Sequence, residues 1–577
     1  MKHTKCYIPE YPRPQFVRAD WQNLCGEWDF GFGEETKENN ALEGKLSRKI
    51  IVPFSYQSKA SGIGLEEHHA VVWYSRKISG KAGKRTILNI DGADYETSVF
   101  VNGKLVGTHI GAYSRFSFDI TDFLVKEDNI LTIRCSDDNH PIQVRGKQRW
   151  EKQNFGCWYV ETTGIYKSVW LEYVDDVYLT NLKITPSIKD YSVRFDFAVN
   201  KPSHDVEVKF AISYDGKPIC SARVSADDID NGVSLRLDSR ELTYQVEHWS
   251  VGNPVLYDID ITVYNNDVPV DAVGSYFGLR EYVTKDDKIM LNNVPFYARL
   301  VLDQGYWPES GLTPPSEEAL VNDILLSKEM GFNGARKHQK VEDERYFYYA
   351  DILGFTVWCE LPSNHWACDK ATKQITKEWL DIVTQNYNHP SLVTWVIFNE
   401  SWGVRNIMVN PEQSNLATGL YYLTKSIDSM RPVISNDGWM HAKSDILTIH
   451  HYEQDGEKLC SFYDDIYKLV EGDITGHQHL PYADGYEYEG QPIIMSEFGG
   501  TAYTGETNDV CWGYGNGVAN DEEYIERLTS LVDAIRRMNI SGYCYTQITD
   551  VEQEVNGVLR ADRTPKVALE HIKKINS

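Results

Sequence analysis

The chain has 577 residues, of which 42% are hydrophobic and 12% aromatic, and its formal net charge is −26. This length corresponds to roughly three or four domains, and the composition is that of an ordered globular protein. The negative charge argues against nucleic acid, anionic membranes and polyanions as partners, although a small anionic substrate held by a local cation is not excluded. No run of about eighteen apolar residues occurs, which argues against a membrane span.

The ten cysteines are scattered, with no CxxC pair and no histidine cluster at zinc spacing. Residues 1–12 contain no apolar stretch that could form the core of a signal peptide. We therefore expect reduced thiols and a cytoplasmic location, although removal of a signal peptide would leave the same pattern. No cofactor is expected.

Residues 1–175 are predicted to form an all-β domain. Short alternating segments such as Ala70–Ile78 and Thr97–Val101 recur between turns. The dipeptide Asn102-Gly103 between two such segments predicts a type I′ hairpin. Helical periodicity is nearly absent, so a β-sandwich or jelly roll is expected.

Residues 176–280 continue with short strand-like runs. Examples are Tyr178–Ile184, Ser192–Val199 and Tyr257–Tyr264. About a hundred residues of this kind predict a small immunoglobulin-like β-sandwich.

From residue 281 to residue 577 the pattern changes to alternating strands and helices. Eight strands are predicted: Val294–Leu302, Phe332–Arg336, Phe355–Glu360, Leu392–Phe398, Pro432–Ser435, Ile446–Ile449, Pro492–Ser496 and Ser541–Thr546. Ser316 is expected to cap a helix after two prolines, and Ala371–Tyr387 and Asp521–Met538 also have helical spacing. This pattern predicts a (β/α)8 TIM barrel.

The segment Glu453–Gly490 is longer than an ordinary loop of such a barrel and is rich in tyrosine and histidine. Long insertions in compact domains are usually lids or binding loops. An oligomer contact is the alternative interpretation.

Two glutamates stand where apolar runs end. Glu400 ends Ser391–Glu400 and Glu497 ends Gln491–Glu497, 97 residues apart. Polar residues at the C-terminal ends of barrel strands lie on the catalytic face. Glycoside hydrolases use two carboxylates there, one to protonate the leaving oxygen and one to attack the sugar. Each glutamate alone could merely cap the following helix, but two together favour an active site.

Further polar residues end other predicted strands and should converge on the same rim. The candidates for substrate binding are Asp303, Gln304, Arg336, Lys337, His338, Asn399, Tyr452 and Tyr545.

Several motifs together resemble glycoside hydrolase family 2, which contains β-galactosidases, β-glucuronidases and β-mannosidases. They are Ser98–Gly103, Gly111–Ile120, Thr163–Leu171, Asn388–Glu400 and Pro492–Glu497. The resemblance runs nearly end to end. It implies a sugar-binding-type N-terminal sandwich and a retaining glycosidase activity.

The resemblance also implies roles for single residues. Glu400 matches the general acid/base and Glu497 the nucleophile. Asn399 matches the residue that holds the sugar 2-hydroxyl, and Tyr452 matches the tyrosine that hydrogen-bonds the nucleophile.

Some positions depart from the family pattern. The chain has Arg336–Lys340 where many members read Arg-x-Ser-His-Tyr-Pro, and Tyr545 where better-known members place a tryptophan. The stretch Asp550–Asp562 lacks the Asn-x-Lys with which glucuronidases hold the sugar carboxylate, although Lys337 or Arg560 could bind an acidic sugar differently. The galactosidases of the family bind magnesium near the acid/base, but no ligand set for a metal is evident here.

We therefore predict a retaining exo-β-glycosidase that removes a terminal sugar from an oligosaccharide or glycoconjugate, with a β-galactoside favoured. The alternatives are a β-glucuronidase or β-galacturonidase, and, in another class, an inactive carbohydrate-binding protein. The intact pair of glutamates argues against the inactive protein. The sandwich surfaces are compatible with a homo-oligomer.

Overall fold

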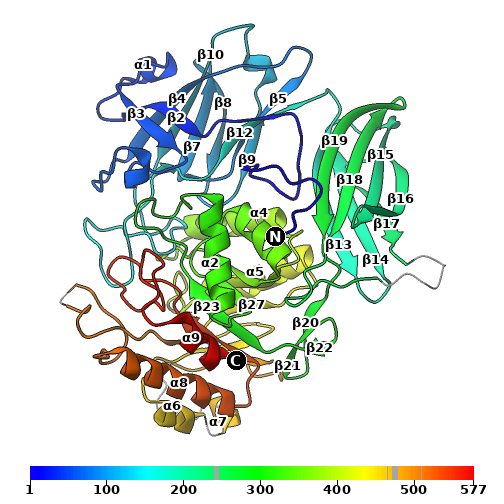
Figure 1. Cartoon of the computed structure of the whole chain (residues 1–577). Coiled ribbons are helices and arrows are strands. Elements are labelled where there is room, and N and C mark those ends of the chain that lie inside the picture. Colours follow the sequence, from blue (N-terminus) through cyan, green and yellow to red (C-terminus); the bar gives the residue numbers. More distant parts are fainter. Residues whose placement is uncertain (239–245, 464, 471–478, 509) are drawn as a thin grey trace.

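The computed structural model describes residues 1–238, 246–463, 465–470, 479–508 and 510–577. Figure 1 shows three parts in chain order: a first β-sandwich in blue, a second in teal and green, and a barrel that continues to the C-terminus in red. The first sandwich lies above the barrel in this view, and the second lies beside both.

The first sandwich packs a four-stranded sheet against a six-stranded one. The smaller sheet has the order β1-β12-β5-β9, formed by Trp21–Asn23, Val169–Val174, Arg85–Ile90 and Phe116–Asp119. The larger has the order β3-β2-β4-β10-β7-β8, formed by Arg48–Val52, Gly26–Phe32, Val71–Ile78, Asn129–Ser136, Glu96–Val101 and Lys104–Ile110. The predicted hairpin joins β7 and β8, with φ of 51° at Asn102 and 75° at Gly103, as a type I′ turn requires.

The second sandwich is the predicted immunoglobulin-like one. One sheet has the order β13-β14-β17 and the other β16-β15-β18-β19. Their bounds are Leu179–Ser187, Ser192–Val199 and Asn231–Arg236, then Lys217–Ala226, Ser203–Tyr214, Tyr257–Asn265 and Val268–Phe277. Alternate residues of these strands point into the core, where Phe195 and Phe210 stack with ring centroids 4.7 Å apart. This inward–outward alternation is the expected pattern of a sandwich.

The third part contains a parallel sheet in the order β27-β26-β25-β24-β23-β30-β29-β28. The strands, in that order, are Val433–Asp437, Leu392–Asn399, Thr356–Glu360, Gly334–Lys337, Ala298–Asp303, Gly542–Thr546, Ile493–Gly499 and Leu447–His450. β27 and β28 lie side by side and nearly close the barrel, so the predicted TIM barrel is confirmed. The first predicted strand is divided, because β22 (Val294–Pro295) joins β20 (Tyr282–Lys285) and β21 (Lys288–Leu291) in a separate small sheet.

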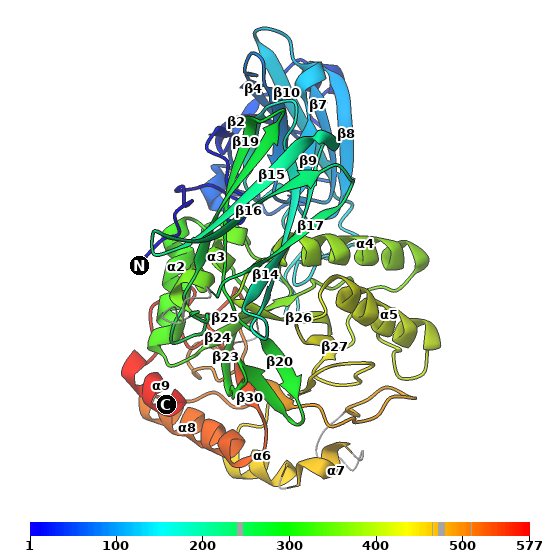
Figure 2. The ribbon, with the colours of Figure 1, turned by 90° about the vertical axis from the view of Figure 1, so that its right-hand side faces the viewer.

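Helices surround the barrel (Figure 2). They are α2 Glu317–Glu329, α3 Glu344–Leu353, α4 Asp369–Asn386, α5 Pro411–Ile427, α6 Gly456–Phe462, α7 Ile466–Val470, α8 Asp521–Arg537 and α9 Leu569–Asn576. Ser316 caps α2 as predicted, since its side chain accepts a hydrogen bond from the Ala319 amide. None of the helices in the described ranges is long and apolar enough to cross a membrane.

The Glu453–Gly490 segment contains α6 and α7, and α6 packs against α8. Residues 464 and 471–478 of this segment lie outside the described residues. Its role as a lid, a binding loop or an oligomer contact stays a prediction.

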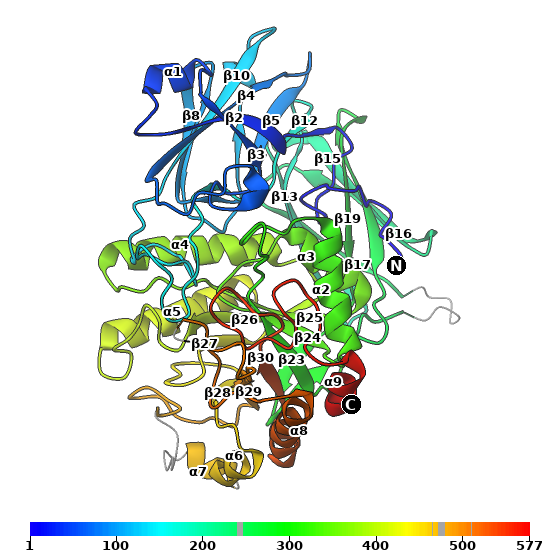
Figure 3. The same ribbon diagram turned by 60° about the vertical axis from the view of Figure 1, so that its left-hand side comes forward.

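A long connection of the first sandwich, residues 137–163 between β10 and β11 (Gly164–Ile165), extends down to the barrel (Figure 3). The amides of Arg145 and Gly146 donate to the Ser363 carbonyl, which follows β25. Because Ser363 lies beyond the C-terminal end of a barrel strand, this connection reaches the rim on which a TIM barrel carries its functional residues.

Candidate active site

Two carboxylates face each other at this rim. Glu400 directly follows β26, and Glu497 lies in β29. One carboxylate oxygen of Glu400 lies within 4.8 Å of one carboxylate oxygen of Glu497. Glu400 and Ser401 adopt positive φ values of 50° and 61°. Such backbone conformations cost energy at non-glycine residues and cluster at functional sites.

Glu497 is held in its ionised form. Arg336 Nη1 donates to Oε1 of Glu497 over 2.7 Å, and the Tyr452 hydroxyl donates to Oε2. Burial by itself raises the pKa of Glu497, but the positive charges of His450 and Arg336, with the hydrogen bond from Tyr452, bring this pKa below its usual value. A carboxylate in this state can act as a nucleophile at neutral pH.

Arg336 organises the barrel interior beneath the two glutamates. Its guanidinium is fully buried and forms ion pairs of 2.7 Å with Glu360, Asp437 and Glu497. It also donates to Oδ1 of Asn399 over 2.6 Å. This contact fixes the orientation of the Asn399 amide, whose Nδ2 has no hydrogen-bond partner among the described residues. A donor is therefore left for a ligand hydroxyl.

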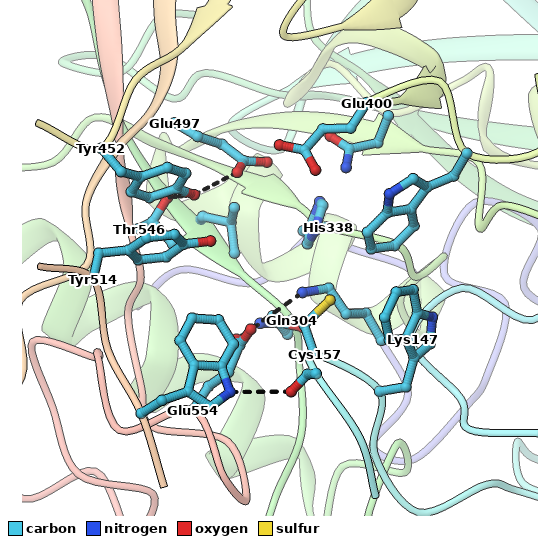
Figure 4. A pocket seen from close by; sticks show the side chains of 16 residues that line it. Lys147, Cys157, Gln304, His338, Glu400, Tyr452, Glu497, Tyr514, Thr546 and Glu554 are labelled. Carbon is cyan, nitrogen blue, oxygen red and sulfur yellow. Dashed lines mark hydrogen bonds and ion pairs between the residues drawn. The ribbon is translucent and has the colours of Figure 1, made fainter. Parts of the chain in front are cut away.

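A pocket of about 210 Å³ lies beside the two glutamates, whose carboxylates line it (Figure 4). The barrel contributes most of its lining: Leu302, Gln304, His338, Asn399, Glu400, Trp402, Tyr452, Glu497, Trp512, Tyr514, Thr546 and Glu554. The connection from the first sandwich contributes the remainder: Lys147, Gly156, Cys157 and Trp158. The first sandwich thus forms one side of the pocket.

A third carboxylate, Glu554, lies across the pocket from the first two. Its Oε2 accepts hydrogen bonds from Tyr159 over 2.6 Å and from Gln304 over 2.9 Å. Its Oε1 lies 3.6 Å from the Lys147 ammonium. Burial by itself lowers the pKa of Lys147, but the neighbouring acidic groups raise it above its ordinary value, so this lysine is a cation inside the pocket.

Within the described residues, Glu400, His450 and Glu497 are the single group of three His, Cys, Asp or Glu side chains close enough to share an ion. Both ring nitrogens of His450 face carboxylate oxygens. The ring therefore acts as a hydrogen-bond donor rather than as a metal ligand, and we assign no metal to this site.

Three family models match the chain. The one described as "Glycosyl hydrolases family 2, TIM barrel domain" covers residues 283–577. The chain belongs to glycoside hydrolase family 2. Models described as "Glycosyl hydrolases family 2" and "Glycosyl hydrolase 2 galactose-binding domain-like" match residues 177–280 and 66–165. The resemblance inferred from the motifs is therefore confirmed.

Individual relatives in glycoside hydrolase family 2 are distant. A putative β-glucuronidase of Formosa agariphila is 24% identical over 86% of this chain and 58% of its own length. A β-galactosidase of Thermoanaerobacter pseudethanolicus is 25% identical over 58% of this chain and 46% of its own length. The chain thus spans about half the length of these curated relatives.

Solved structures of the family share the fold. A β-glucuronidase of Bifidobacterium dentium complexed with coumarin-3-O-glucuronide is 19% identical with a TM-score of 0.81, and the match covers 98% of both chains. A β-galacturonidase of Eisenbergiella tayi bound to galacturonate is 20% identical with a TM-score of 0.75, and the match covers 98% of this chain and 99% of that one.

The structure brings five of the predicted substrate-binding or catalytic positions to the pocket besides Glu400: Gln304, His338, Asn399, Tyr452 and Glu497. Arg336 lies beneath the pocket and contacts it through Asn399 and Glu497.

Lys337, Asp303 and Tyr545 lie outside the pocket lining, because successive side chains of a strand point to opposite faces. Lys337 points away from the barrel interior and pairs with Asp303 at 2.7 Å and Glu342 at 2.8 Å. Tyr545 is buried, with its hydroxyl 3.5 Å from that of Tyr524 in α8.

The sequence interpretation missed Lys147 and Glu554 as site residues, and it left His450 out of the candidates although this residue directly follows the predicted strand Ile446–Ile449. Glu554 lies in the stretch Asp550–Asp562, which lacks the Asn-x-Lys, and His450 stands two positions before Tyr452, so both had a local signal. Lys147 had none, because it reaches the pocket only when the first sandwich docks on the barrel.

Proposed function

We propose that the chain is a retaining exo-β-glycosidase in which Glu497 is the nucleophile and Glu400 the general acid/base. The observation that supports this most strongly is the separation of less than 4.8 Å between oxygens of the two carboxylates. Retaining glycosidases place their carboxyl groups roughly 5–5.5 Å apart, whereas inverting enzymes need roughly 6.5–9.5 Å to admit a water molecule.

In the first step Glu400 donates its proton to the glycosidic oxygen while the Glu497 carboxylate attacks the anomeric carbon. The bond to the leaving group breaks and a glycosyl ester with Glu497 forms. Asn399 Nδ2, which has no partner among the described residues, is directed to the 2-hydroxyl of the sugar. Hydrogen bonds to that hydroxyl strengthen in the transition state.

In the second step a water molecule gives its proton to Glu400 and attacks the anomeric carbon. The ester bond breaks, and Glu497 returns to the carboxylate that Arg336 and Tyr452 stabilise. Two inversions give net retention of configuration.

For the glycone we favour a neutral, galactose-configured sugar. Glu554 Oε1 and the buried Gln304 Oε1, which has no partner among the described residues, offer acceptors for sugar hydroxyls, and Lys147 offers a donor. Glu554 already balances the charge of Lys147, so a sugar carboxylate would add an uncompensated negative charge.

A uronic acid is the second candidate, because Lys147 is a cation inside the pocket. The names of relatives, which include β-glucuronidases and a β-galacturonidase, support the same substrate class. A glycoconjugate aglycone, a cytoplasmic location and a homo-oligomer stay predictions.

A panel of nitrophenyl β-glycosides tests the proposal: galactoside, galacturonide, glucuronide, glucoside and mannoside. We expect turnover of at least one glycone, with the galactoside leading. Absence of turnover on every glycone, with sugar binding retained in calorimetry, would instead support the inactive carbohydrate-binding protein.

A further inference from the structure

His450 lies between the two glutamates, and the double-displacement scheme above does not use it. The residue ends β28. Its Nδ1 lies 2.8 Å from Oε1 of Glu400 and 3.5 Å from Oε2 of Glu497. On the other side of the ring, Nε2 lies 3.2 Å from Oδ2 of Asp437. One imidazole therefore contacts the proposed acid/base Glu400, the proposed nucleophile Glu497 and the carboxylate of Asp437.

The surroundings hold this ring in one place. Asp437 ends β27 and is itself fixed by Arg336 at 2.7 Å and by the Ser496 hydroxyl at 2.9 Å. Gly438 has a φ of 99°, and a Cβ atom there would lie 2.6 Å from Nδ1 of His450. The absence of a side chain at Gly438 thus leaves the space that the imidazole fills, and any larger residue at 438 would displace the ring.

The contacts specify the protonation state of the ring. A neutral imidazole has one donor and one acceptor nitrogen, whereas both nitrogens of the imidazolium donate. Burial by itself lowers the pKa of His450, but the charges of Glu497 and Asp437 and the hydrogen bonds to Asp437 and Glu400 raise it to about 10. The charged and titratable groups around the ring are Glu400, Asp437, Glu497, Arg336, His338 and His441.

We propose, on the basis of the retaining mechanism proposed above, that His450 is a positioning residue whose imidazolium holds Glu400 and stabilises the negative charge that Glu400 acquires when it protonates the leaving group. His450 keeps both of its protons throughout. The proton that reaches the glycosidic oxygen comes from Glu400, and the water of the second step returns one to Glu400. Asp437 anchors the imidazolium from behind and exchanges no proton.

The variant that tests this is His450→Asn, which removes the cation and keeps a small polar side chain. Removing a positive charge beside two carboxyl groups favours the protonated form of both. Both limbs of the pH profile of kcat/KM should therefore move to higher pH, by about one unit. The loss of kcat/KM should be at least about tenfold greater for a poor leaving group than for dinitrophenolate, because Glu400 becomes a weaker acid.

The matched control is His441→Asn. His441 is also buried at this rim, but it hydrogen-bonds Ser444 and Thr448, and burial lowers its pKa to about 4. This variant should leave the pH limbs and the leaving-group dependence unchanged. A uniform loss on all leaving groups in His450→Asn, with unmoved pH limbs, would show that His450 is only structural.

A second measurement does not depend on turnover. In protein with ¹⁵N-labelled histidines, the signal lost in His450→Asn should be that of a doubly protonated imidazole at pH 8. A neutral ring at that pH would overturn the proposal. If no glycoside in the panel is hydrolysed, the proposed glycosidase function fails, and this spectrum still decides whether His450 is the cation that we infer.

Discussion

Lys147 and Glu554 meet on the side of the pocket opposite Glu400 and Glu497, with the ammonium nitrogen 3.6 Å from Oε1 of the carboxylate. Lys147 comes from the connection of the first sandwich, and Glu554 follows the last strand of the barrel, β30. Both side chains are buried. Because neither part alone forms this pair, the side of the pocket opposite Glu400 and Glu497 exists only in the docked molecule.

The pair leads to a prediction about the choice of sugar. For a neutral sugar, Glu554→Gln should lower kcat/KM because an acceptor for hydroxyl groups is lost. For a uronide, the same change should raise kcat/KM because it removes a negative charge beside the carboxylate, and Lys147→Met should abolish activity. The measurement is kcat/KM on nitrophenyl galactoside and galacturonide.

If the glycone is a neutral galactose-configured sugar, kcat/KM for nitrophenyl β-glucuronide should be at least about a hundredfold lower than for the best substrate. This ratio corresponds to about 2.7 kcal/mol of lost transition-state binding. Lys337→Met is the matched control, since Lys337 pairs with Asp303 and Glu342 outside the pocket. Lys337→Met should change kcat/KM for the glucuronide and for the best substrate by the same factor. Comparable rates on glucuronide and galactoside would contradict the preference and identify Lys147 as the residue to test first.

Substitution of the two glutamates separates their roles. Glu497→Ala should abolish turnover of every substrate. Glu400→Ala should slow substrates with poor leaving groups far more than activated aryl glycosides, which need little protonation. Azide should restore part of the Glu400→Ala activity by attacking the glycosyl ester. A leaving-group effect that follows Glu497 instead would reverse the assignment.

Tyr452→Phe should lower kcat by about 10–100-fold, because a hydrogen bond to a charged group contributes roughly 1.5–3 kcal/mol. The Tyr452 hydroxyl donates to Glu497 and also contacts Thr546 at 3.1 Å. The control is Tyr545→Phe, whose hydroxyl faces Tyr524 rather than the pocket. An equal loss in both variants would show that packing, not the contact with Glu497, is responsible.

The raised pKa of His389 predicts how the stability of the protein depends on pH. Burial by itself lowers its pKa, but Asp351 at 2.6 Å and the nearby Glu344 raise it to about 9. A folded pKa above the unfolded value stabilises the protein below about pH 6.5, and this contribution is lost as the pH rises through 9.

His389→Gln should therefore cost about 3 kcal/mol at pH 6, and the difference in Tm from the unsubstituted protein should shrink between pH 6.5 and 9 and nearly vanish above pH 9. His441→Asn is the control, since the lowered pKa of His441 predicts a Tm difference that is flat above pH 6.5. A His389→Gln difference that is equally flat would contradict the assignment of a charged His389.

The barrel could be predicted because buried parallel strands are nearly continuous apolar runs, and β26 and β29 are fully buried along their length. The ends of these runs located Glu400 and Glu497. The same reasoning placed Lys337 and Tyr545 at the rim, but it did not fix which face of the strand each side chain occupies. The sequence could not place Lys147 in the pocket, because the position of this residue depends on how the first sandwich docks on the barrel.

The proposed function depends on hydrolysis with retention of configuration through Glu497. The most direct measurement is a ¹H NMR time course on whichever nitrophenyl β-glycoside the protein cleaves fastest, recorded before mutarotation. The β-anomer of the free sugar should appear first. Initial formation of the α-anomer would contradict it.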